Sequence, residues 1–367
     1  MKVLIAGGGT AGHVFPALAL SSRLISDGHE VRFAGTSHGQ EARLVRGAGL
    51  PFEEIRARPL ERKLSMRAVT APITAVAAVK ACRPLVSWAD VVVGMGGYVS
   101  VPVALACLRA RRPLVLHEQN AVPGLANRTF ARPARRVALA FPEARRGLPR
   151  RTRSVVTGNP VRDEILSVHG DRDRLAKEAI RELDLAEGRR TVVVFGGSQG
   201  ALHVNRSVVD AIGRLALDDL QLLLLTGPAH VGSVRAAIPS GVPTIVRVVG
   251  FLERMTLAYA VADLVIARAG ATTVAEVAAC GLPSLLIPYP YATGRHQEAN
   301  ARALQRAGAS TMLLDDELDG RVLADRIGRL LSDDDRLLRM GACARAWSRP
   351  DAAEALARVV LEAGDGG

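Results

Sequence analysis

Two stretches decide the fold: residues 2–13 read KVLIAGGGTAGH, and residues 191–205 read TVVVFGGSQGALHVN. Each begins with a short apolar run, continues through closely spaced glycines and then enters a segment that can form a helix. This succession of buried strand, glycine loop and helix is typical of the start of a Rossmann-like domain. Because it occurs twice, the sequence predicts two Rossmann-like units in one chain.

Other short apolar runs predict the remaining strands. They are rich in Val, Ile and Leu and alternate with longer Ala- and Leu-rich segments, as expected of parallel strands that are buried on both faces. The fold class is therefore α/β, and the carboxyl ends of the strands are expected to line a ligand crevice. Besides the run at 191–195, the expected strands are Lys2–Ala6, Glu30–Ala34, Val91–Gly94, Leu114–His117, Ser154–Thr157 and Leu264–Ala267.

A charged stretch without a strand pattern, Asp163–Gly188, follows the first predicted unit. We place the boundary at its start, so that the two domains cover residues 1–160 and 161–350. A final helix is expected over Asp351–Glu362, with Pro350 in its first turn. It packs either on its own domain or back on the first.

The composition favours a folded protein in a reducing compartment. Of 367 residues, 49% are hydrophobic and 23% are charged, which is enough apolar material for two cores. The first apolar run is too short for a signal peptide, and no apolar run reaches the roughly 20 residues of a membrane span. The cysteines have no paired spacing, which argues against disulfides and zinc; they are Cys82, Cys107, Cys280 and Cys343.

The net charge of +12 indicates an anionic partner. Aromatic residues make up only 4% of the chain and no recognition module for nucleic acid appears, so nucleic acid is not expected. An anionic membrane surface or phosphate ligands explain the charge. Basic residues precede an apolar stretch at 68–79, which predicts either a membrane-docking element or a buried helix with a charged lead-in. They are Arg56, Arg58, Arg62, Lys63 and Arg67.

The first glycine loop offers backbone N–H groups to a diphosphate, because Gly7, Gly9 and Gly12 satisfy GxGxxG after a strand. An NAD enzyme would place Asp or Glu at the end of the next strand, but Glu30–Ala34 is followed by Gly, Thr and Ser. NAD binding is therefore disfavoured. His13 follows the loop directly and is either a general base or a polar group at a helix start.

The second half of the chain carries a matching set of polar groups. Ser198 adds a hydroxyl to the second glycine loop, where a diphosphate could also bind. Residues 268–277 are expected to open a helix that Gly281 ends. On this helix Glu276 has two interpretations: it forms a capping box with Thr273, or it accepts two hydrogen bonds from a ribose diol.

Polar clusters follow three apolar runs, and loops in such places usually carry function. They read GGYVS at 96–100, HEQN at 117–120 and GNPVR at 158–162, while HQEAN at 296–300 is a fourth cluster or the start of a helix. No two histidines have metal-ligand spacing on one helix and HExxH is absent, so no metal is expected. The DRD at 171–173 matches a metal–diphosphate DxD only formally and is expected to be solvated linker surface.

Together these motifs resemble the MurG family, the N-acetylglucosaminyltransferases of peptidoglycan synthesis. The resemblance spans essentially the whole chain, and the fixed order of its motifs makes it specific. They are GGGTAGHVFPALA at 7–19, GGYVSVP at 96–102, HEQNAVPGLAN at 117–127, TGNPVR at 157–162, GGSQGA at 196–201, RAGATTVAEVAACGLPSLLIPYP at 268–290 and HQEANA at 296–301.

The resemblance implies a GT-B fold, in which two Rossmann-like domains face each other across a cleft. It implies an acceptor site and a membrane-docking surface in the first domain and UDP-N-acetylglucosamine (UDP-GlcNAc) held mainly by the second. The implied reaction is an inverting, metal-independent transfer of GlcNAc to the C4 hydroxyl of the MurNAc-pentapeptide of undecaprenyl-diphosphate lipid I, giving lipid II, without a cofactor. The protein would act peripherally at the cytoplasmic face of the bacterial cell membrane.

Several alternatives stay open. Another GT-B glycolipid glycosyltransferase or a UDP-sugar epimerase would share the fold and some of the glycine loops. An NAD oxidoreductase is disfavoured by the missing ribose carboxylate, and a non-catalytic lipid-binding module is disfavoured by two intact phosphate loops.

The resemblance also assigns site residues. His13 is the preferred general base, and His117 and Glu118 are the other candidates. Ala11 replaces a glycine that is common in the family, and His296 stands where some relatives have a second glutamine. The acceptor diphosphate falls to Gly96, Gly97 and Tyr98. The donor contacts fall to Thr10, Ala11, Gly12, Asn120, Arg162, Ser198, Leu252, Ala271, Thr272, Thr273, Val274, Ala275, Glu276 and Gln297.

Overall fold

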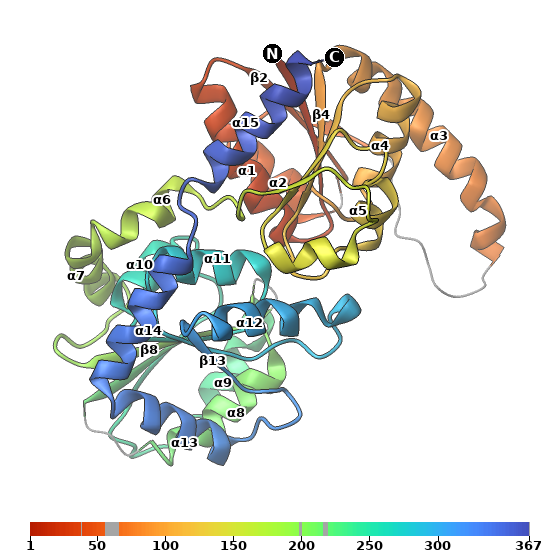
Figure 1. The fold of residues 1–367 in the computed structure, drawn as a ribbon. Helices are drawn as coiled ribbons and strands as arrows, with labels where there is room; N and C mark the ends of the chain where they lie inside the picture. Colours follow the sequence, from red (N-terminus) through yellow and green to blue (C-terminus); the bar gives the residue numbers. More distant parts are fainter. Residues whose placement is uncertain (38, 56–65, 198–199, 216–218, 367) are drawn as a thin grey trace. The chain divides into compact units, whose positions relative to one another are not determined.

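The computed structural model describes residues 1–37, 39–55, 66–197, 200–215 and 219–366. The chain divides into two compact units (Figure 1), of which unit 1 comprises Met1–Arg162 and Arg349–Gly367 and unit 2 comprises Asp163–Ser348. The chain therefore leaves unit 1 once and returns to it, whereas unit 2 is continuous in sequence. No helix in the described part of the chain has the length and hydropathy of a membrane span.

Unit 1 contains a parallel sheet in the order β3-β2-β1-β4-β5-β6-β7. The strand order reverses beside β1, which pairs with both β2 and β4, so the crevice at their carboxyl ends is the expected ligand site. The strands are β1 (Lys2–Ala6), β2 (Glu30–Gly35), β3 (Phe52–Glu54), β4 (Val91–Gly94), β5 (Leu114–Glu118), β6 (Arg136–Leu139) and β7 (Ser154–Val156). The helices are α1 (Ala11–Ser26), α2 (Gln40–Gly47), α3 (Met66–Trp88), α4 (Ser100–Arg109), α5 (Leu125–Phe130), the 3-10 helix η1 (Pro142–Gly147) and α15 (Ala352–Asp365).

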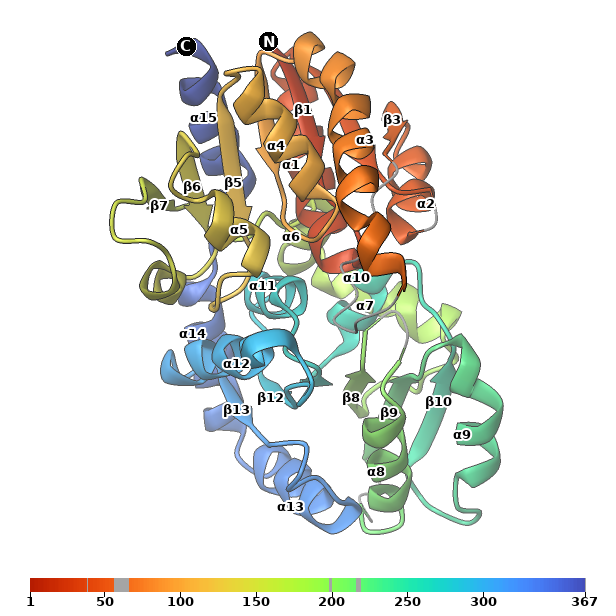
Figure 2. The same cartoon turned by 90° about the vertical axis from the view of Figure 1, so that its right-hand side faces the viewer.

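The sheet of unit 1 is covered on both faces (Figure 2). Along β1, Val3 and Ile5 pack with residues of α1, α2 and α15, while Leu4 and Ala6 pack with residues of α3, α4 and α5. This alternation follows from the two-residue period of a strand. Burial on both faces explains why the strands read as continuous apolar runs.

Unit 2 contains a second parallel sheet, in the order β10-β9-β8-β11-β12-β13. Its strands are β8 (Arg190–Phe195), β9 (Leu220–Leu225), β10 (Ile245–Val249), β11 (Leu264–Ala267), β12 (Ser284–Leu286) and β13 (Ser310–Met312). Its α-helices are α6 (Asp163–Leu166), α7 (Arg172–Glu182), α8 (Leu202–Ile212), α9 (Val231–Ala237), α10 (Met255–Val261), α11 (Ala271–Ala279), α12 (His296–Arg306), α13 (Gly320–Leu331) and α14 (Asp334–Trp347). Its 3-10 helices are η2 (Ser167–His169), η3 (Pro228–His230) and η4 (Thr293–Arg295).

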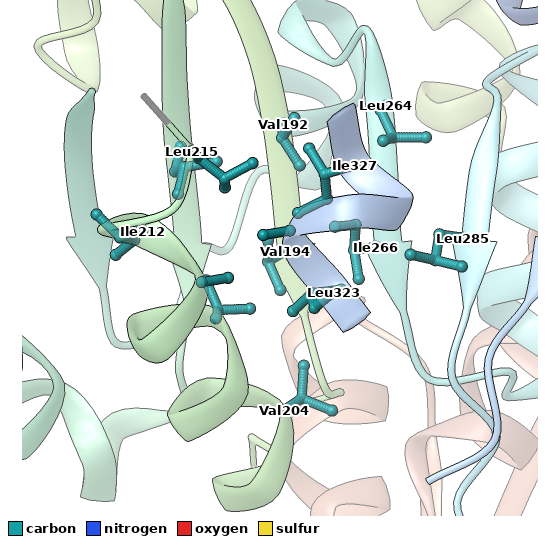
Figure 3. Packing of buried hydrophobic residues seen from close by; sticks show 14 of the residues in the cluster. Val192, Val194, Val204, Ile212, Leu215, Leu264, Ile266, Leu285, Leu323 and Ile327 are labelled. Atoms are coloured by element: carbon teal, nitrogen blue, oxygen red, sulfur yellow. The ribbon is translucent and has the colours of Figure 1, made fainter. Parts of the chain in front are cut away.

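One face of the second sheet forms an aliphatic core with α8 and α13. Figure 3 shows Leu323 and Ile327 of α13 pointing toward Val194 of β8 and Ile266 of β11. Val193, whose side chain points to the opposite face, is also fully buried. The predicted α/β class is therefore confirmed in both halves of the chain.

Three local expectations are wrong. The charged stretch after residue 162 is not a linker, because 171–173 begins α7, where Arg172 donates hydrogen bonds to the carbonyl oxygens of Ala260 and Ala262. The expected strands did not include β3, β6, β9, β10, β12 or β13. Pro350 lies before the N-cap of the last helix, which is Asp351, and so is outside the first turn.

Candidate active site

The loops at the carboxyl edge of the first sheet lie against one another. Strands β1, β4 and β5 are neighbours, so the loops that follow them are brought together. A Cβ at Gly97 would lie 2.7 Å from the carbonyl oxygen of Gly8, and the backbone there has a φ of +76°. Both facts require glycine at this position. The ring of Tyr98 lies close to Gly9 in the same way, 3.2 Å from where a Cβ would stand.

His13 stands in the first turn of α1, beside these loops. Its ring lies 3.4 Å from the Cβ positions of both Gly96 and Gly97, so the imidazole lies against the loop that follows β4. The ring nitrogen Nδ1 is 3.1 Å from Oε1 of Gln119. The side chain is partly exposed. The structure therefore brings His13 together with two of the polar clusters singled out in the sequence.

His117 lies inside the unit, behind Gln119. It is fully buried, its Nδ1 is 3.0 Å from Nε2 of Gln119, and its Nε2 is 3.1 Å from the carbonyl oxygen of Gly158. Burial lowers the pKa of His117 to about 4, because an imidazolium would lose its hydration. With both ring nitrogens engaged, His117 cannot reach an acceptor hydroxyl in this structure. The expectation that it could serve as the base is not supported.

Glu118 organises the loop that follows β5. It is 2% exposed, and its two carboxylate oxygens accept hydrogen bonds from the backbone N–H groups of Asn120 (3.0 Å) and Gly124 (2.9 Å) and from the side chain of Asn127 (2.9 Å). These bonds engage both oxygens of the carboxylate within the loop. Glu118 is therefore a positioning residue for Asn120, and His13 is the accessible candidate of the three.

A buried carboxylate that the sequence did not reveal lies beside the first glycine loop. Glu41 is fully buried and accepts hydrogen bonds from the Thr36 hydroxyl (2.5 Å) and from the backbone N–H of Gly9 (3.4 Å). One of the backbone N–H groups that a diphosphate would use, that of Gly9, is thus already bonded within the protein. The loop is therefore not a ready dinucleotide site, in spite of its GxGxxG spacing.

The other candidate residues of unit 1 lie at the same edge or at the end of the unit. Thr10 is the N-cap of α1, and Ala11 and Gly12 begin the helix. Ala11 is not among the positive-φ residues, so an alanine there needs no strained backbone. The guanidinium of Arg162 stacks over the ring of Phe15 at 4.3 Å.

The candidate donor residues of unit 2 follow three different strands. Leu252 comes shortly after β10, residues 271–276 lie in α11 after β11, and Gln297 is the second residue of α12. The side-chain oxygen of Gln297 accepts a hydrogen bond of 2.9 Å from the backbone N–H of Tyr289. Its amide NH₂ group is therefore the part that can donate to a ligand. Ser198 lies outside the described residues.

Glu276 is buried inside α11, at 6% exposure. Its carboxylate accepts a hydrogen bond of 2.8 Å from the hydroxyl of Tyr259, and the N-cap of the helix is Gly270. The capping-box interpretation is therefore wrong, since Thr273 lies within the helix. Gly281 does end the helix as predicted, with a φ of +67° and its N–H bonded to the carbonyl of Ala278.

A buried ion pair supports the neighbouring loop of unit 2. Arg268, 8% exposed, pairs with Asp315 and donates to the carbonyl oxygens of Ile287 (3.3 Å) and Pro288 (3.2 Å). These bonds fix the segment that leads to Tyr289 and hence to Gln297. In the described ranges, no cluster of three or more His, Cys, Asp or Glu side chains could hold a metal ion.

Comparisons with known proteins agree along the whole chain. Residues 3–139 match the model of the glycosyltransferase family 28 N-terminal domain, and residues 191–356 match that of the family 28 C-terminal domain. A protein of Halothermothrix orenii named UDP-N-acetylglucosamine--N-acetylmuramyl-(pentapeptide) pyrophosphoryl-undecaprenol N-acetylglucosamine transferase is 39% identical, with 100% of each chain covered. A protein of Mycolicibacterium smegmatis with the same name is 43% identical, covering 99% of this chain and 94% of its own.

A solved structure agrees with these relatives. The crystal structure of Acinetobacter baumannii MurG is 30% identical and has a TM-score of 0.76, with 98% of this chain and 99% of that chain covered. The chain belongs to the MurG family. The GT-B class expected from the sequence is confirmed by this MurG structure together with the two parallel sheets.

Some residues that shape the site of this MurG-family chain were not predicted from the sequence. Gln119 belongs to the HEQN cluster at 117–120, so the sequence indicated its place in the site but not its role. Tyr259 had no local signal, because its partner Glu276 is 17 positions away along the chain, and the contact of Glu41 with the glycine loop spans 32 positions.

Proposed function

We propose that this chain transfers GlcNAc from UDP-GlcNAc to the C4 hydroxyl of the MurNAc-pentapeptide of undecaprenyl-diphosphate lipid I, which yields lipid II for peptidoglycan synthesis. The observation that carries the proposal is the similarity of 39–43% identity, over nearly the full chain, to transferases named for this reaction. The partly exposed imidazole at the carboxyl edge of the first sheet supports it independently, because glycosyl transfer needs a proton acceptor.

In this reaction the C4 oxygen attacks the anomeric carbon from the face opposite the diphosphate. The bond from that carbon to the diphosphate oxygen breaks, UDP leaves and the configuration inverts. Negative charge develops on the departing diphosphate, and cations and N–H donors stabilise it. In our proposal Arg162 and Ser198 serve the diphosphate, Glu276 accepts hydrogen bonds from the ribose diol, and the amide NH₂ of Gln297 donates to the sugar.

The proton of the attacking hydroxyl goes to His13. Its ring lies against Gly96 and Gly97, and in the proposal these two residues and Tyr98 bind the acceptor diphosphate, so the acceptor sugar comes within reach of the imidazole. Glu118 acts through Asn120, which it holds at the same edge. Unit 1 is thus assigned to the acceptor, and unit 2 holds most of the donor, with Arg162 of unit 1 contributing to the donor diphosphate.

Because the proposed acceptor is a lipid, our proposal includes peripheral action at the cytoplasmic face of the bacterial cell membrane. We assign docking to the basic residues ahead of the apolar stretch 68–79, whose charge suits an anionic surface. Residues 56–65 and the side chains at 66–75 lie outside the described structure, so this assignment rests on sequence alone.

The proposal is tested by incubating the protein with UDP-GlcNAc and a water-soluble lipid I analogue and measuring the masses of the products by mass spectrometry. We expect the acceptor to gain one N-acetylhexosamine, UDP to be released in equal amount, and the new linkage to be β. Release of UDP with free sugar, or conversion of the donor to its 2-epimer without gain of mass by the acceptor, would reject the transferase. A parallel incubation with UDP-GalNAc measures donor selectivity.

A further inference from the structure

A chain of four hydrogen-bonding groups runs from the surface of unit 1 into its interior. It begins at His13, passes through the side-chain amide of Gln119 and ends at His117, whose Nε2 lies 3.1 Å from the carbonyl oxygen of Gly158. A second branch joins Nε2 of Gln119 to the carbonyl oxygen of Met95 at 2.8 Å. The inner end of the chain and its branch therefore both terminate at backbone carbonyls, which can only accept hydrogen bonds.

The carbonyls of Met95 and Gly158 determine which atom is the donor in each hydrogen bond of the chain. The amide of Gln119 must point its NH₂ group at Met95, so its oxygen faces Nδ1 of His13. The second N–H of the amide then donates to Nδ1 of His117, whose remaining nitrogen donates to Gly158. The opposite amide orientation would set the Gln119 oxygen against a carbonyl oxygen 2.8 Å away. It would also place an acceptor opposite each ring nitrogen of His117 and so require a protonated ring, which burial disfavours by lowering the pKa of His117.

We propose that Gln119 is a positioning residue that holds neutral His13 as the Nδ1–H tautomer, so that Nε2 is the nitrogen that accepts the proton. The oxygen of Gln119 can only accept, and the ring nitrogen facing it must therefore carry hydrogen. Nε2 lies on the side of the ring next to Gly97, 3.6 Å from its Cβ position. The basic nitrogen thus faces the loop that we assign to the acceptor.

The same contact serves both charge states of His13. When Nε2 takes a proton, Nδ1 keeps its hydrogen and its bond to Gln119, so no neighbour has to reorient during the transfer. A preorganised partner of this kind removes a reorganisation cost from the reaction. The base-orienting group here is a neutral amide whose own orientation is fixed by Met95 and His117.

The first test measures tautomers directly and needs no substrate. Protein labelled with ¹⁵N at its eight histidines is examined by long-range ¹H–¹⁵N correlation above the titration range of imidazole, and variants lacking His13 or His117 assign the signals. We expect opposite tautomers, Nδ1–H for His13 and Nε2–H for His117. An Nε2–H tautomer at His13 would overturn the inference. This outcome is independent of whether the chain transfers GlcNAc.

The second test asks what the orientation does for the reaction, and here the inference rests on the proposed function. Gln119→Leu should lower kcat by about tenfold or more while the KM for UDP-GlcNAc stays within about twofold. In Gln119→Leu the acidic limb of the kcat–pH profile should move to lower pH, because the protonated ring of His13 loses a hydrogen-bond acceptor. In Gln119→Glu the added carboxylate should move this limb to higher pH. Limbs that do not move in either variant would remove Gln119 from the mechanism.

Gln221 provides a matched control in unit 2. It is 1% exposed, like Gln119, and its amide also makes three hydrogen bonds, with the backbone of Ala186 and the hydroxyl of Thr191. Gln221→Leu should lower the melting temperature as Gln119→Leu does, without moving the pH profile or the His13 tautomer. Equal kinetic effects in both variants would make the loss a general consequence of destabilisation and would overturn the inference. An Nδ1–H tautomer of His13 in wild type together with an unchanged kcat in Gln119→Leu would show that Gln119 does not assist the reaction and would overturn the kinetic part of the inference.

Discussion

The two units share a parallel sheet with a glycine loop after its first strand in sequence, yet the carboxyl edges of the sheets carry different groups. In unit 1 the edge holds, beside the buried carboxylates of Glu41 and Glu118, a chain of hydrogen-bonding groups formed by His13, Gln119 and His117. In unit 2 the edge holds charged groups that are buried and paired: Glu276 with the hydroxyl of Tyr259, and Arg268 with Asp315.

This difference indicates that the sheet determines where a ligand can bind, while the side chains after each strand determine the chemistry. A chain of neutral groups with fixed proton positions is suited to moving a proton. Buried, paired charges are suited to holding a polar ligand in one orientation. Variants at the two edges should therefore fail in different ways.

The largest effect is expected at His13. His13→Ala should lower kcat by about a hundredfold or more, because general base catalysis contributes on the order of 10²–10⁴, while UDP binding stays nearly unchanged. Steady-state kinetics and UDP titration measure the two quantities. His169, an exposed histidine of unit 2, provides the control His169→Ala, which should behave as wild type. A His13→Ala variant that keeps kcat but loses UDP affinity would make His13 a phosphate ligand.

Glu276→Ala should impair donor use and leave acceptor use intact. Losing a hydrogen bond to a charged group costs about 1.5–3 kcal/mol, which corresponds to a roughly ten- to hundredfold lower kcat/KM for UDP-GlcNAc. The matched variant Tyr259→Phe removes the same internal hydrogen bond but keeps the carboxylate, and its kcat/KM should stay within about fivefold of wild type. If the two variants lose donor efficiency equally, the carboxylate supports α11 and does not contact the ribose.

The buried imidazole of unit 1 should make that unit sensitive to acid. The pKa of His117 is about 4 in the folded chain and 6.5 in the reference state, so the unfolded chain takes up the proton first. The stabilisation is complete above pH 6.5 and is lost as the pH falls toward 4. Between pH 7.5 and 5 the free energy of unfolding should fall by about 2 kcal/mol more in wild type than in His117→Gln.

Tryptophan fluorescence can follow this transition, because the chain has two tryptophans, Trp88 in unit 1 and Trp347 in unit 2. Urea unfolding in a Trp347→Phe background reports on unit 1 alone. The corresponding Trp88→Phe background reports on unit 2, where His117→Gln should change nothing. Equal pH dependence with and without the imidazole at position 117 would refute the assignment.

The smallest effect is expected at the membrane. Arg62→Gln, Lys63→Gln or Arg67→Gln, taken singly, should weaken binding to anionic vesicles by about fivefold, since each basic residue near such a surface contributes about 1 kcal/mol. Turnover of a short-chain, water-soluble acceptor should be unaffected. Arg321→Gln, at an exposed position of unit 2, is the control. Vesicle affinity that is unchanged at low salt in all three variants would move docking away from this stretch.

The fold could be predicted where strands are buried on both faces. Lys2–Ala6, Val91–Gly94 and Leu264–Ala267 were predicted with the bounds that the structure shows, because both faces of each strand demand apolar residues. Strand β3 was not predicted because it is a three-residue edge strand with the sequence FEE. Strand β6 was not predicted because RVAL follows an Ala- and Arg-rich segment that could also be helical.

Only those site residues that belong to a local sequence pattern could be predicted. His13 stood out because it follows a glycine loop, and the HEQN cluster stood out because it follows a strand. The assignment of roles within the cluster was partly wrong, since the imidazole of His117 points into the core and the amide of Gln119 meets His13, 106 positions away. The capping box at Thr273 failed for a similar reason, because the long-range partner Tyr259 takes the carboxylate.

The return of the chain to unit 1 has a consequence for synthesis on the ribosome. Helix α15 places Leu356 and Val360 in the core that also contains Val3 and Ile5, and Gly158 lies against Arg349 at the point where the chain comes back. The first unit in sequence therefore lacks part of its interior until α15 has been translated. Unit 2, encoded without interruption, can complete its core earlier, so the nascent chain finishes its second half before its first.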